Sequence, residues 1–182
     1  QIAWQLHDHA GKLLSNENLI VKPDGFTIPF NAEKVHGIST QRALDEGLPL
    51  DEVLDRFTED LNKADLIIGH NIIDFDVKVV GTEYLRIGKE NVIASKEALD
   101  TQLASTEYCA IPGGRGGQFK WPSLQELHTK LFGTDFGDAH DAAYDVAANA
   151  KCFFGLLKEK VVKPVDATAV DDIQYEEPEL DA

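Results

Sequence analysis

The sequence contains no methionine and has few cysteines, few basic residues and no long apolar run. Seventeen lysines and arginines stand against 32 aspartates and glutamates, which gives a net charge of −15 over 182 residues. This balance argues against a protein that binds nucleic acid over a broad surface, because that mode of binding needs clustered basic side chains. No stretch approaches the roughly 20 apolar residues of a membrane span, and the first residues lack the order of a signal peptide. We therefore expect a cytoplasmic protein without a membrane partner.

The two ends of the sequence differ from its middle. The chain opens at Gln1 with residues typical of the inside of a strand, and together with the absence of methionine this leads us to expect an upstream segment. At the other end, residues 165–182 hold seven acidic and no basic side chains, and without them the net charge would be −8. Such a composition favours a solvated terminus. We predict one domain over residues 1–160, incomplete at its N-terminus, and an acidic, flexible tail over residues 161–182.

The cysteines and three of the histidines show no metal-site pattern. Cys109 and Cys152 have apolar neighbours and form neither a CxxC pair nor a Cys/His metal spacing. We expect both to be reduced, buried thiols. His7, His9 and His128 have no partner at ligand spacing, and we expect them at the surface.

Hydrophobic periodicity predicts a mixed α/β fold. Two apolar-rich stretches, 2–6 and 13–21, flank Gly11 and are typical of a β-hairpin. A short continuous apolar run at 64–69 is expected of a strand covered on both faces. Helical periodicity is present at 40–46, 48–62, 74–87, 101–108 and 123–133 and in a last helix that includes Val146 to Leu157, and a weaker strand is predicted at 92–98.

The segment 69–76, GHNIIDFD, directly follows the apolar run. Ligands collect outside the carboxyl ends of strands in α/β sheets, so its polar side chains stand where sites are usually built. Asp74 and Asp76 are two residues apart and do not share a helical face, so at most one of them would meet a given metal ion. We select Asp76, with Asp74 as a helix cap or a solvated residue. From this segment alone, a plain turn capped by Asn71 or Asp74 remains an alternative.

A second polar segment, 139–145 (AHDAAYD), opens the last predicted helix. His140 and Asp145 are five residues apart, about 140° around an ideal helix, so they converge only where His140 precedes the first turn. An N-cap at Asp138 or Asp141 would produce that arrangement. Alternatively, His140 is a surface loop residue and Asp145 a solvated helix charge.

Together the two segments are far more specific than either alone. The NxxxFD pattern after a buried strand and the HxxxxD pattern at a late helix resemble the second and third motifs of the DEDDh 3′-5′ exonucleases of the polymerase III epsilon type. The likeness includes the hairpin, the segment 31–39 (NAEKVHGIS) and the order of the motifs over roughly residues 1–157. It implies a ribonuclease H-like mixed β-sheet flanked by helices, whose first strand is central and carries an Asp-x-Glu pair. The given chain lacks that strand, and we predict that it precedes Gln1.

The resemblance also implies the chemistry. Asp76 and Asp145 match the family's metal ligands, His140 matches its general base, and Asn71 and Phe75 belong to a motif that contacts substrate. Phosphodiester hydrolysis needs a hydroxide at neutral pH and relief of negative charge, which two divalent cations, Mg²⁺ or Mn²⁺, held by carboxylates can supply. Two carboxylates alone would hold two cations poorly, which is a further reason to expect the upstream pair.

The segment 35–39, VHGIS, is a weaker signal. It resembles the family segment that positions the terminal nucleotide, so His36 and the backbone at Gly37 are candidate substrate contacts. A plain turn containing glycine is the alternative.

The glycine-rich stretch 111–122, IPGGRGGQFKWP, lacks the GxxxxGK[ST] pattern of a phosphate-binding loop. We expect a mobile surface loop. Alternatively, Arg115 and Lys120, with the aromatic residues Phe119 and Trp121, would steady an incoming single strand by charge and stacking.

The sequence thus predicts a metal-dependent exonuclease that removes nucleoside 5′-monophosphates from the 3′ end of single-stranded DNA, with a DNA polymerase catalytic subunit as a candidate partner. Two alternatives stay open. The motifs encode phosphodiester cleavage and not sugar identity, so an RNA-directed 3′-5′ exoribonuclease fits them as well. A non-catalytic nucleic-acid-binding or scaffold domain that lacks the first acidic motif is the third possibility.

Overall fold

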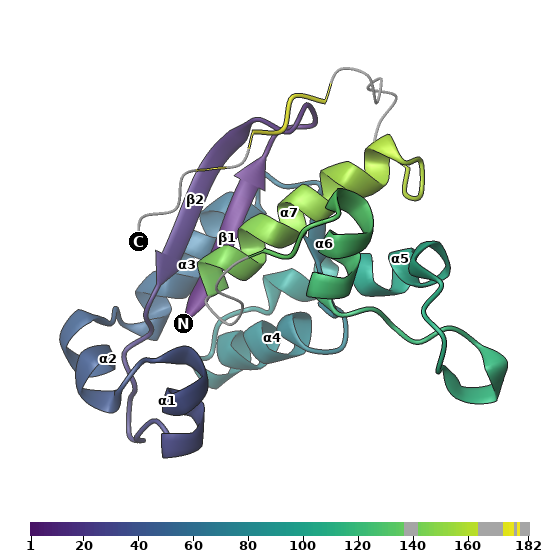
Figure 1. The fold of residues 1–182 in the computed structure, drawn as a ribbon. Coiled ribbons are helices and arrows are strands. Elements are labelled where there is room, and N and C mark those ends of the chain that lie inside the picture. Colours follow the sequence, from purple (N-terminus) through teal and green to yellow (C-terminus); the bar gives the residue numbers. More distant parts are fainter. Residues whose placement is uncertain (137–141, 164–172, 177, 179–182) are drawn as a thin grey trace.

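The structure, a computed structural model, describes residues 1–136, 142–163, 173–176 and 178. Strands and helices are mixed along the chain, as the sequence predicts (Figure 1). Within these ranges no helix has the length and apolar character needed to cross a bilayer. In chain order the elements are β1 (Ile2–His7), β2 (Leu13–Leu19), α1 (Phe30–His36), α2 (Thr40–Glu46), α3 (Leu50–Leu61), β3 (Leu66–Gly69), α4 (Asp76–Arg86), the 3-10 turn η1 (Val92–Ser95), β4 (Glu97–Asp100), α5 (Thr101–Cys109), the 3-10 turn η2 (Arg115–Gly117), α6 (Leu124–Phe132) and α7 (Ala142–Lys158).

The predicted hairpin is confirmed. β1 and β2 pair antiparallel, and the Asp8 carboxylate closes the turn by accepting from the N–H groups of Ala10 and Lys12 at 3.0 and 2.9 Å. Trp4 lies on the face toward α3, where its indole N–H donates to the Asp60 carboxylate at 3.0 Å. The hairpin is therefore fixed both at its turn and across its buried face.

The second pair of strands is parallel. β3 and β4 run side by side with Gly69 opposite Asp100. The strand predicted at 92–98 is displaced, because its first apolar residues form η1, which packs against α4 and buries Ile93. Since both strands run in the same direction, they end at one edge of the fold.

Helix α1 covers a segment in which periodicity predicted no helix. It has seven residues, none of them buried, so it offers no apolar stripe from which it could be recognised. Gly37 ends it in the left-handed conformation, with φ of 71°, and donates its N–H to the Glu33 carbonyl. With α2 it forms the lobe at the lower left of Figure 1.

Helix α7 joins the two pairs of strands. It packs against both β1 and β3, and it passes in front of β1 in Figure 1. Within the described residues β1 and β3 are not hydrogen-bonded to each other, so the strands form two pairs and not one continuous sheet. The buried face of α7 is mostly apolar and includes Cys152, Phe153 and Leu156. This helix therefore holds the two halves of the fold together.

The cysteines are reduced and buried, as predicted. Cys109 and Cys152 belong to one apolar cluster with Leu127 and Leu156. Burial raises the pKa of Cys152 to about 12, so this thiol stays protonated and unreactive at neutral pH.

The prediction that His128 lies at the surface is wrong. The residue is 2% exposed, and its ring packs against Phe132 and Phe136 at centroid distances of 4.8 and 5.4 Å. Its Nδ1 also lies 2.7 Å from the Thr134 carbonyl, so the residues that follow α6 fold back over the ring. His9 is exposed, as predicted, and His7 is half-buried.

Part of the predicted tail packs against the hairpin and α7. Tyr175, within the described segment 173–176, stacks on Phe154 with ring centroids 4.9 Å apart. Gly11 leaves room for this contact, since a Cβ there would lie 3.1 Å from Tyr175. These four residues belong to the fold, and the division of the chain at residue 160 stays a prediction.

Candidate active site

Two parallel strands end side by side where the predicted motif begins. Gly69 of β3 and Asp100 of β4 are register partners, so the turn after β3 starts next to the Asp100 carboxylate. Asp100 is only 6% exposed. Ligands in α/β proteins bind at this edge of a sheet, and residues 69–76, here called the motif turn, occupy it.

The Asp100 carboxylate holds the motif turn in place. Its Oδ1 accepts from the backbone N–H of Asn71 and from that of Gln102, both at 3.0 Å, so it also caps α5. Asn71 has φ of 62°, in the left-handed region that asparagine tolerates better than most residues. Gly69 is required before it, because a Cβ there would lie 2.5 Å from the buried Ile72 side chain. One carboxylate thus fixes both the start of α5 and the turn that leads into α4.

A second set of hydrogen bonds ties the motif turn to α7 and to the loop before α6. His70 Nε2 donates to the Pro122 carbonyl at 2.9 Å, and Nδ1 lies 3.1 Å from the Thr101 hydroxyl. Thr101 has no exposed surface, and its hydroxyl also lies 2.8 Å from Asn149 Oδ1 of α7. Asn149 is about one helical turn after Asp145. The motif turn and the helix that carries Asp145 therefore meet at one buried hydroxyl.

Asp76 is the first residue of α4, and its side chain is exposed. The protein around it still reduces its hydration, which raises the pKa of the Asp76 carboxyl, and the negative charge of Asp100 raises that pKa further. Repulsion between two neighbouring carboxylates is the kind of strain that a bound cation relieves.

Asp74 is solvated, which is one of its two predicted roles. Its carboxylate is exposed and pairs with Lys78 at 2.7 Å. It does not cap α4, whose N-cap position is Phe75 and which has no side-chain cap. The alternative of a turn capped by Asn71 or Asp74 is therefore wrong.

The predicted residues of the third motif are described only in part. Asp145 lies in the first turn of α7 and is half-buried. His140, the predicted general base, and Asp138 and Asp141, the predicted N-caps, lie outside the described residues. The roles of His140 and Asp145 stay predictions.

The predicted substrate contacts fall on two parts of the surface. Asn71 and Phe75 lie in the motif turn with Asp76, and the Phe75 side chain is 60% exposed. His36 instead lines an open cavity of about 480 Å³, together with arginines of α2 and α3. No described residue of that lining belongs to the motif turn. The structure brings Asn71 and Phe75 together with Asp76, whereas His36 and the adjacent Gly37 are placed at the end of α1.

The described residues do not make a complete metal site. Nowhere in them do three histidine, cysteine, aspartate or glutamate side chains lie close enough together to hold a metal ion. Asp76 and Asp145 alone would hold two hard cations poorly. A complete site for two such cations needs further carboxylates from outside the described residues.

His70 gives the site a pH dependence that can be measured. Burial lowers the pKa of His70, and the Pro122 carbonyl and the Asp100 charge offset this in part. The folded protein therefore binds this proton less tightly than the unfolded chain does. The stability that His70 contributes is present above the ordinary histidine pKa of about 6.5 and is lost as the pH falls through the lowered value.

We expect an NMR titration of the His70 imidazole to give a pKa below that of the same residue in the urea-unfolded protein. The midpoint temperature of unfolding should fall between about pH 7 and pH 5. A folded-state pKa of His70 at or above the unfolded value would contradict a neutral, half-buried imidazole.

Three residues that build this site were missed in the sequence. Asp100 directly precedes the predicted helix 101–108, and an aspartate in that place is a recognisable N-cap signal. Thr101 and Asn149 give no such signal, because they are 48 residues apart and neither belongs to a motif.

Comparison with known proteins bears on the family and on the fold. The sequence profile of the RNase T exonuclease family matches residues 9–153, well over half of the chain. No curated protein has a significant match. E. coli Exonuclease I in complex with a dA16 oligonucleotide superposes with a TM-score of 0.64 at 21% identity, covering 87% of this chain and 41% of that one. The complex of the E. coli enzyme with a dT13 oligonucleotide gives 0.66 at 23% identity, covering 84% and 35%.

A zinc-bound form of the complex of the E. coli enzyme with single-stranded DNA gives a TM-score of 0.62 at 22% identity, covering 83% of this chain and 34% of that one. The chain thus spans about two-fifths or less of these Exonuclease I chains, and identities this low support the fold alone. The predicted fold class, a mixed α/β ribonuclease H-like fold, is confirmed. From the profile match, the chain belongs to the RNase T exonuclease family.

Proposed function

We propose that this protein is a 3′-5′ exonuclease that hydrolyses single-stranded DNA from its 3′ end and releases nucleoside 5′-monophosphates. The observation that carries the proposal is the joining of the motif turn to α7 by the hydrogen bonds of Thr101, at the edge where both parallel strands end. In a member of an exonuclease family, this gives the segments of Asp76 and Asp145 a common buried support.

The DNA substrate is supported by the similar structures. Two of the E. coli Exonuclease I structures that superpose on this chain hold DNA oligonucleotides, dA16 in one and dT13 in the other. The exposed ring of Phe75 beside Asp76 offers a face on which a terminal base could stack. A stacked base would place the last phosphodiester near the start of α4.

Exonucleases of this type use divalent metal ions. We propose Mg²⁺ or Mn²⁺, with Asp76 and Asp145 among the ligands and His140 as the general base. When bound, such cations generate a hydroxide at neutral pH and neutralise charge on the leaving oxygen. The described residues contain no group of three potential metal-ligand side chains, so the proposed site needs further ligands from outside them. Asp100 and Thr101 would hold the motif turn and α7 in fixed positions relative to each other, whether or not cations are bound.

A role in proofreading or repair, beside a polymerase catalytic subunit, is the more specific part of the proposal. The polymerase III epsilon-like order of the motifs supports it. Co-purification of the protein with a replicative polymerase would test this part independently of the nuclease activity.

The test of the proposed activity compares 5′-labelled single-stranded DNA and RNA of one sequence, each with Mg²⁺, Mn²⁺ or EDTA. We expect DNA to shorten from its 3′ end with either metal and to stay intact in EDTA, with nucleoside 5′-monophosphates as the product on chromatography. Faster degradation of RNA would instead favour the exoribonuclease alternative. Binding of either strand without cleavage under every condition would favour a non-catalytic domain.

A further inference from the structure

We propose that residues 112–121, here called the arm, bind the single-stranded substrate on the 5′ side of its terminal nucleotide. Arg115 and Lys120 would hold phosphates, and Phe119 and Trp121 would stack on bases. This inference rests on the proposed function and adds to it the surface that holds the strand.

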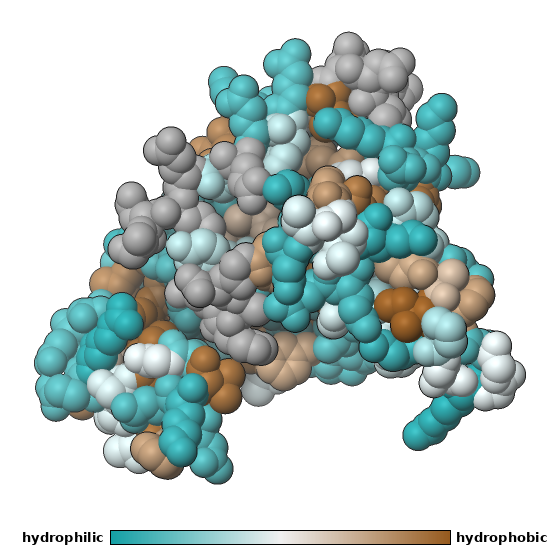
Figure 2. All heavy atoms as spheres, viewed as in Figure 1, coloured by the Kyte–Doolittle hydropathy of each residue, from teal (hydrophilic) through white to brown (hydrophobic). Residues whose placement is uncertain are grey.

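The arm stands away from the body of the protein. The Lys120 N–H donates to the Ile111 carbonyl at 2.8 Å and closes the loop at its base. Gly113, Gly116 and Gly117 have φ of 114°, 67° and 80°, and a Cβ at any of them would meet no atom within 4 Å. Glycine is therefore needed here for the path of the backbone and not for packing. Figure 2 shows the arm projecting at the lower right, with open space between it and the lobe of α1 and α2.

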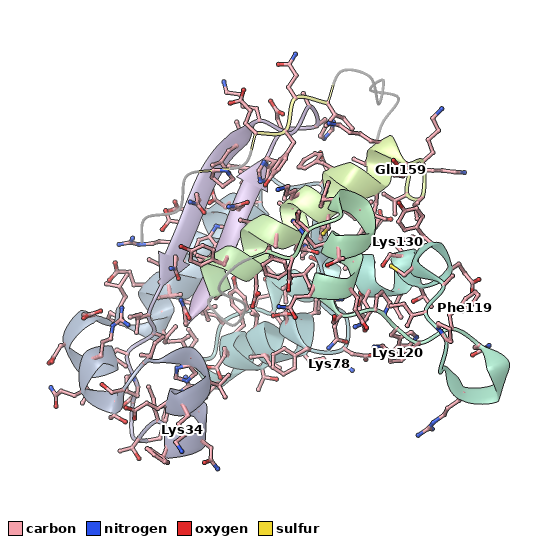
Figure 3. All side chains as sticks on the ribbon, in the orientation of Figure 1. Lys34, Lys78, Phe119, Lys120, Lys130 and Glu159 are labelled. Carbon is pink, nitrogen blue, oxygen red and sulfur yellow. The ribbon has the colours of Figure 1, made fainter. Side chains whose placement is uncertain are left out.

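The base of the arm is fixed to the motif turn. Pro122, the residue after the arm, is fully buried and accepts the hydrogen bond from His70 Nε2 at 2.9 Å. His70 is followed six residues later by Asp76. In the view of Figure 3, Lys78, on the first turn of α4, lies between the lobe that carries Lys34 and the arm that carries Phe119. A strand whose 3′ end lies at Asp76 can therefore leave the site on the side of the arm.

The arm is basic in a strongly acidic protein. Residues 108–125 contain no aspartate or glutamate, although the chain has 32 of them. Of the four arginines, Arg42, Arg56 and Arg86 each pair with a glutamate of the same helix. Arg115 forms no ion pair with any described residue, and it is exposed. Its planar guanidinium is thus available for bidentate contact with a phosphate group.

The aromatic residues of the arm complete a surface for a single strand. Phe119 and Trp121 are 38% and 59% exposed and flank Lys120. Lys120 pairs with Glu126 at 2.7 Å, and an exposed pair of this kind is weak enough to be exchanged for a phosphate. Interleaved aromatic and basic side chains bind single strands without sequence preference, because every base has a face that can stack. Such a surface suits an enzyme that must move along any sequence.

The test uses the full-length protein and the variants Arg115→Ala and Trp121→Ala. Two substrates are compared: a single-stranded oligothymidylate, and the p-nitrophenyl ester of thymidine 5′-monophosphate, which carries one nucleotide and cannot extend to the arm. We expect the ratio of kcat/KM for the oligonucleotide to kcat/KM for the ester to fall about tenfold in each variant. Trp121→Phe, which keeps a stacking ring, should restore most of the ratio. Arg86→Ala is the matched control, since Arg86 is exposed at the far end of α4 from Asp76.

Fluorescence anisotropy of a labelled oligothymidylate in EDTA gives a second readout that does not need hydrolysis. We expect the Kd to rise about tenfold in Arg115→Ala and in Trp121→Ala, and not in Arg86→Ala. An unchanged Kd and an unchanged ratio would overturn the proposal, and so would an equal fall in activity on both substrates. If the unmodified protein hydrolysed neither substrate, the proposed function would fail, and the anisotropy alone would decide whether the arm binds the strand.

Discussion

Replacing Asp76 with asparagine should abolish metal-dependent digestion of a single-stranded oligonucleotide. The variant keeps the size of the side chain and removes the charge that we propose as a metal ligand. We expect the rate to fall by more than about 100-fold, because losing even an outer-shell partner of a ligand typically costs about 10- to 100-fold. Gel assays of a 5′-labelled strand, over a range of Mg²⁺ concentrations, measure the loss.

Unfolding should not explain that loss of activity. The pKa of the Asp76 carboxyl is raised, so the folded state disfavours its charge, and the neutral asparagine should leave the midpoint temperature of unfolding unchanged or higher. Asp74→Asn is the matched control, because Asp74 lies in the same turn, is exposed and pairs with Lys78 alone. Digestion by the Asp76 variant at the rate of the Asp74 variant would remove Asp76 from the proposed metal site.

Replacing Asp100 with alanine should destabilise the fold and weaken the site together. The change removes the N-cap of α5, worth about 0.5–2 kcal/mol. It also removes the charged acceptor of the Asn71 N–H, and a hydrogen bond to a charged group contributes about 1.5–3 kcal/mol. Relief of the repulsion between Asp100 and Asp76 offsets part of this. We expect the free energy of unfolding to fall by about 2–4 kcal/mol, measured by urea denaturation.

The conservative variant separates hydrogen bonding from charge at this position. Asp100→Asn keeps an Oδ1 that accepts from Asn71, Gln102 and Leu103, so most of the stability should return. If Asp100 positions the motif turn, the alanine variant should lose kcat at saturating metal, and asparagine should restore it. As a control, Asp74→Ala should change the free energy of unfolding by no more than about 0.5 kcal/mol. If Asp100→Ala were as stable as this control, the role of Asp100 in the turn would be contradicted.

Local patterns predicted much of the fold, because their physical causes lie within a few residues. The hairpin follows from alternating stretches around Gly11, and the start of α6 follows from Ser123, whose hydroxyl forms a capping box with Glu126. The prediction for His128 failed because the burial of a polar ring depends on how the chain packs around it. Its ring lies against Phe132 and Phe136, and its Nδ1 lies 2.7 Å from the Thr134 carbonyl, contacts that no hydrophobic pattern signals.

The candidate active site likewise contains some residues that the sequence predicts and others that it does not. Asn71 and Asp76 could be recognised because they belong to one short motif. The residue that holds their turn could not, because Asp100 is 29 positions from Asn71 and reaches it only through the register of β3 and β4. The link from His70 to Pro122 crosses 52 positions. Strand pairing sets such contacts, and no pattern within a single segment encodes them.

The late position of α7 in the sequence also determines when the chain can fold during translation. His7 of β1 packs against Phe154 of α7, with ring centroids 5.5 Å apart. On the ribosome, β1 and β2 emerge long before α7, which packs against both of them. Contacts between residues so far apart in the sequence form slowly. Until α7 has been synthesised, both pairs of strands lack the helix that packs against them, and their exposed apolar faces can associate with those of another nascent chain. Synthesis of α7 is therefore the step after which these apolar faces can be buried within the same chain.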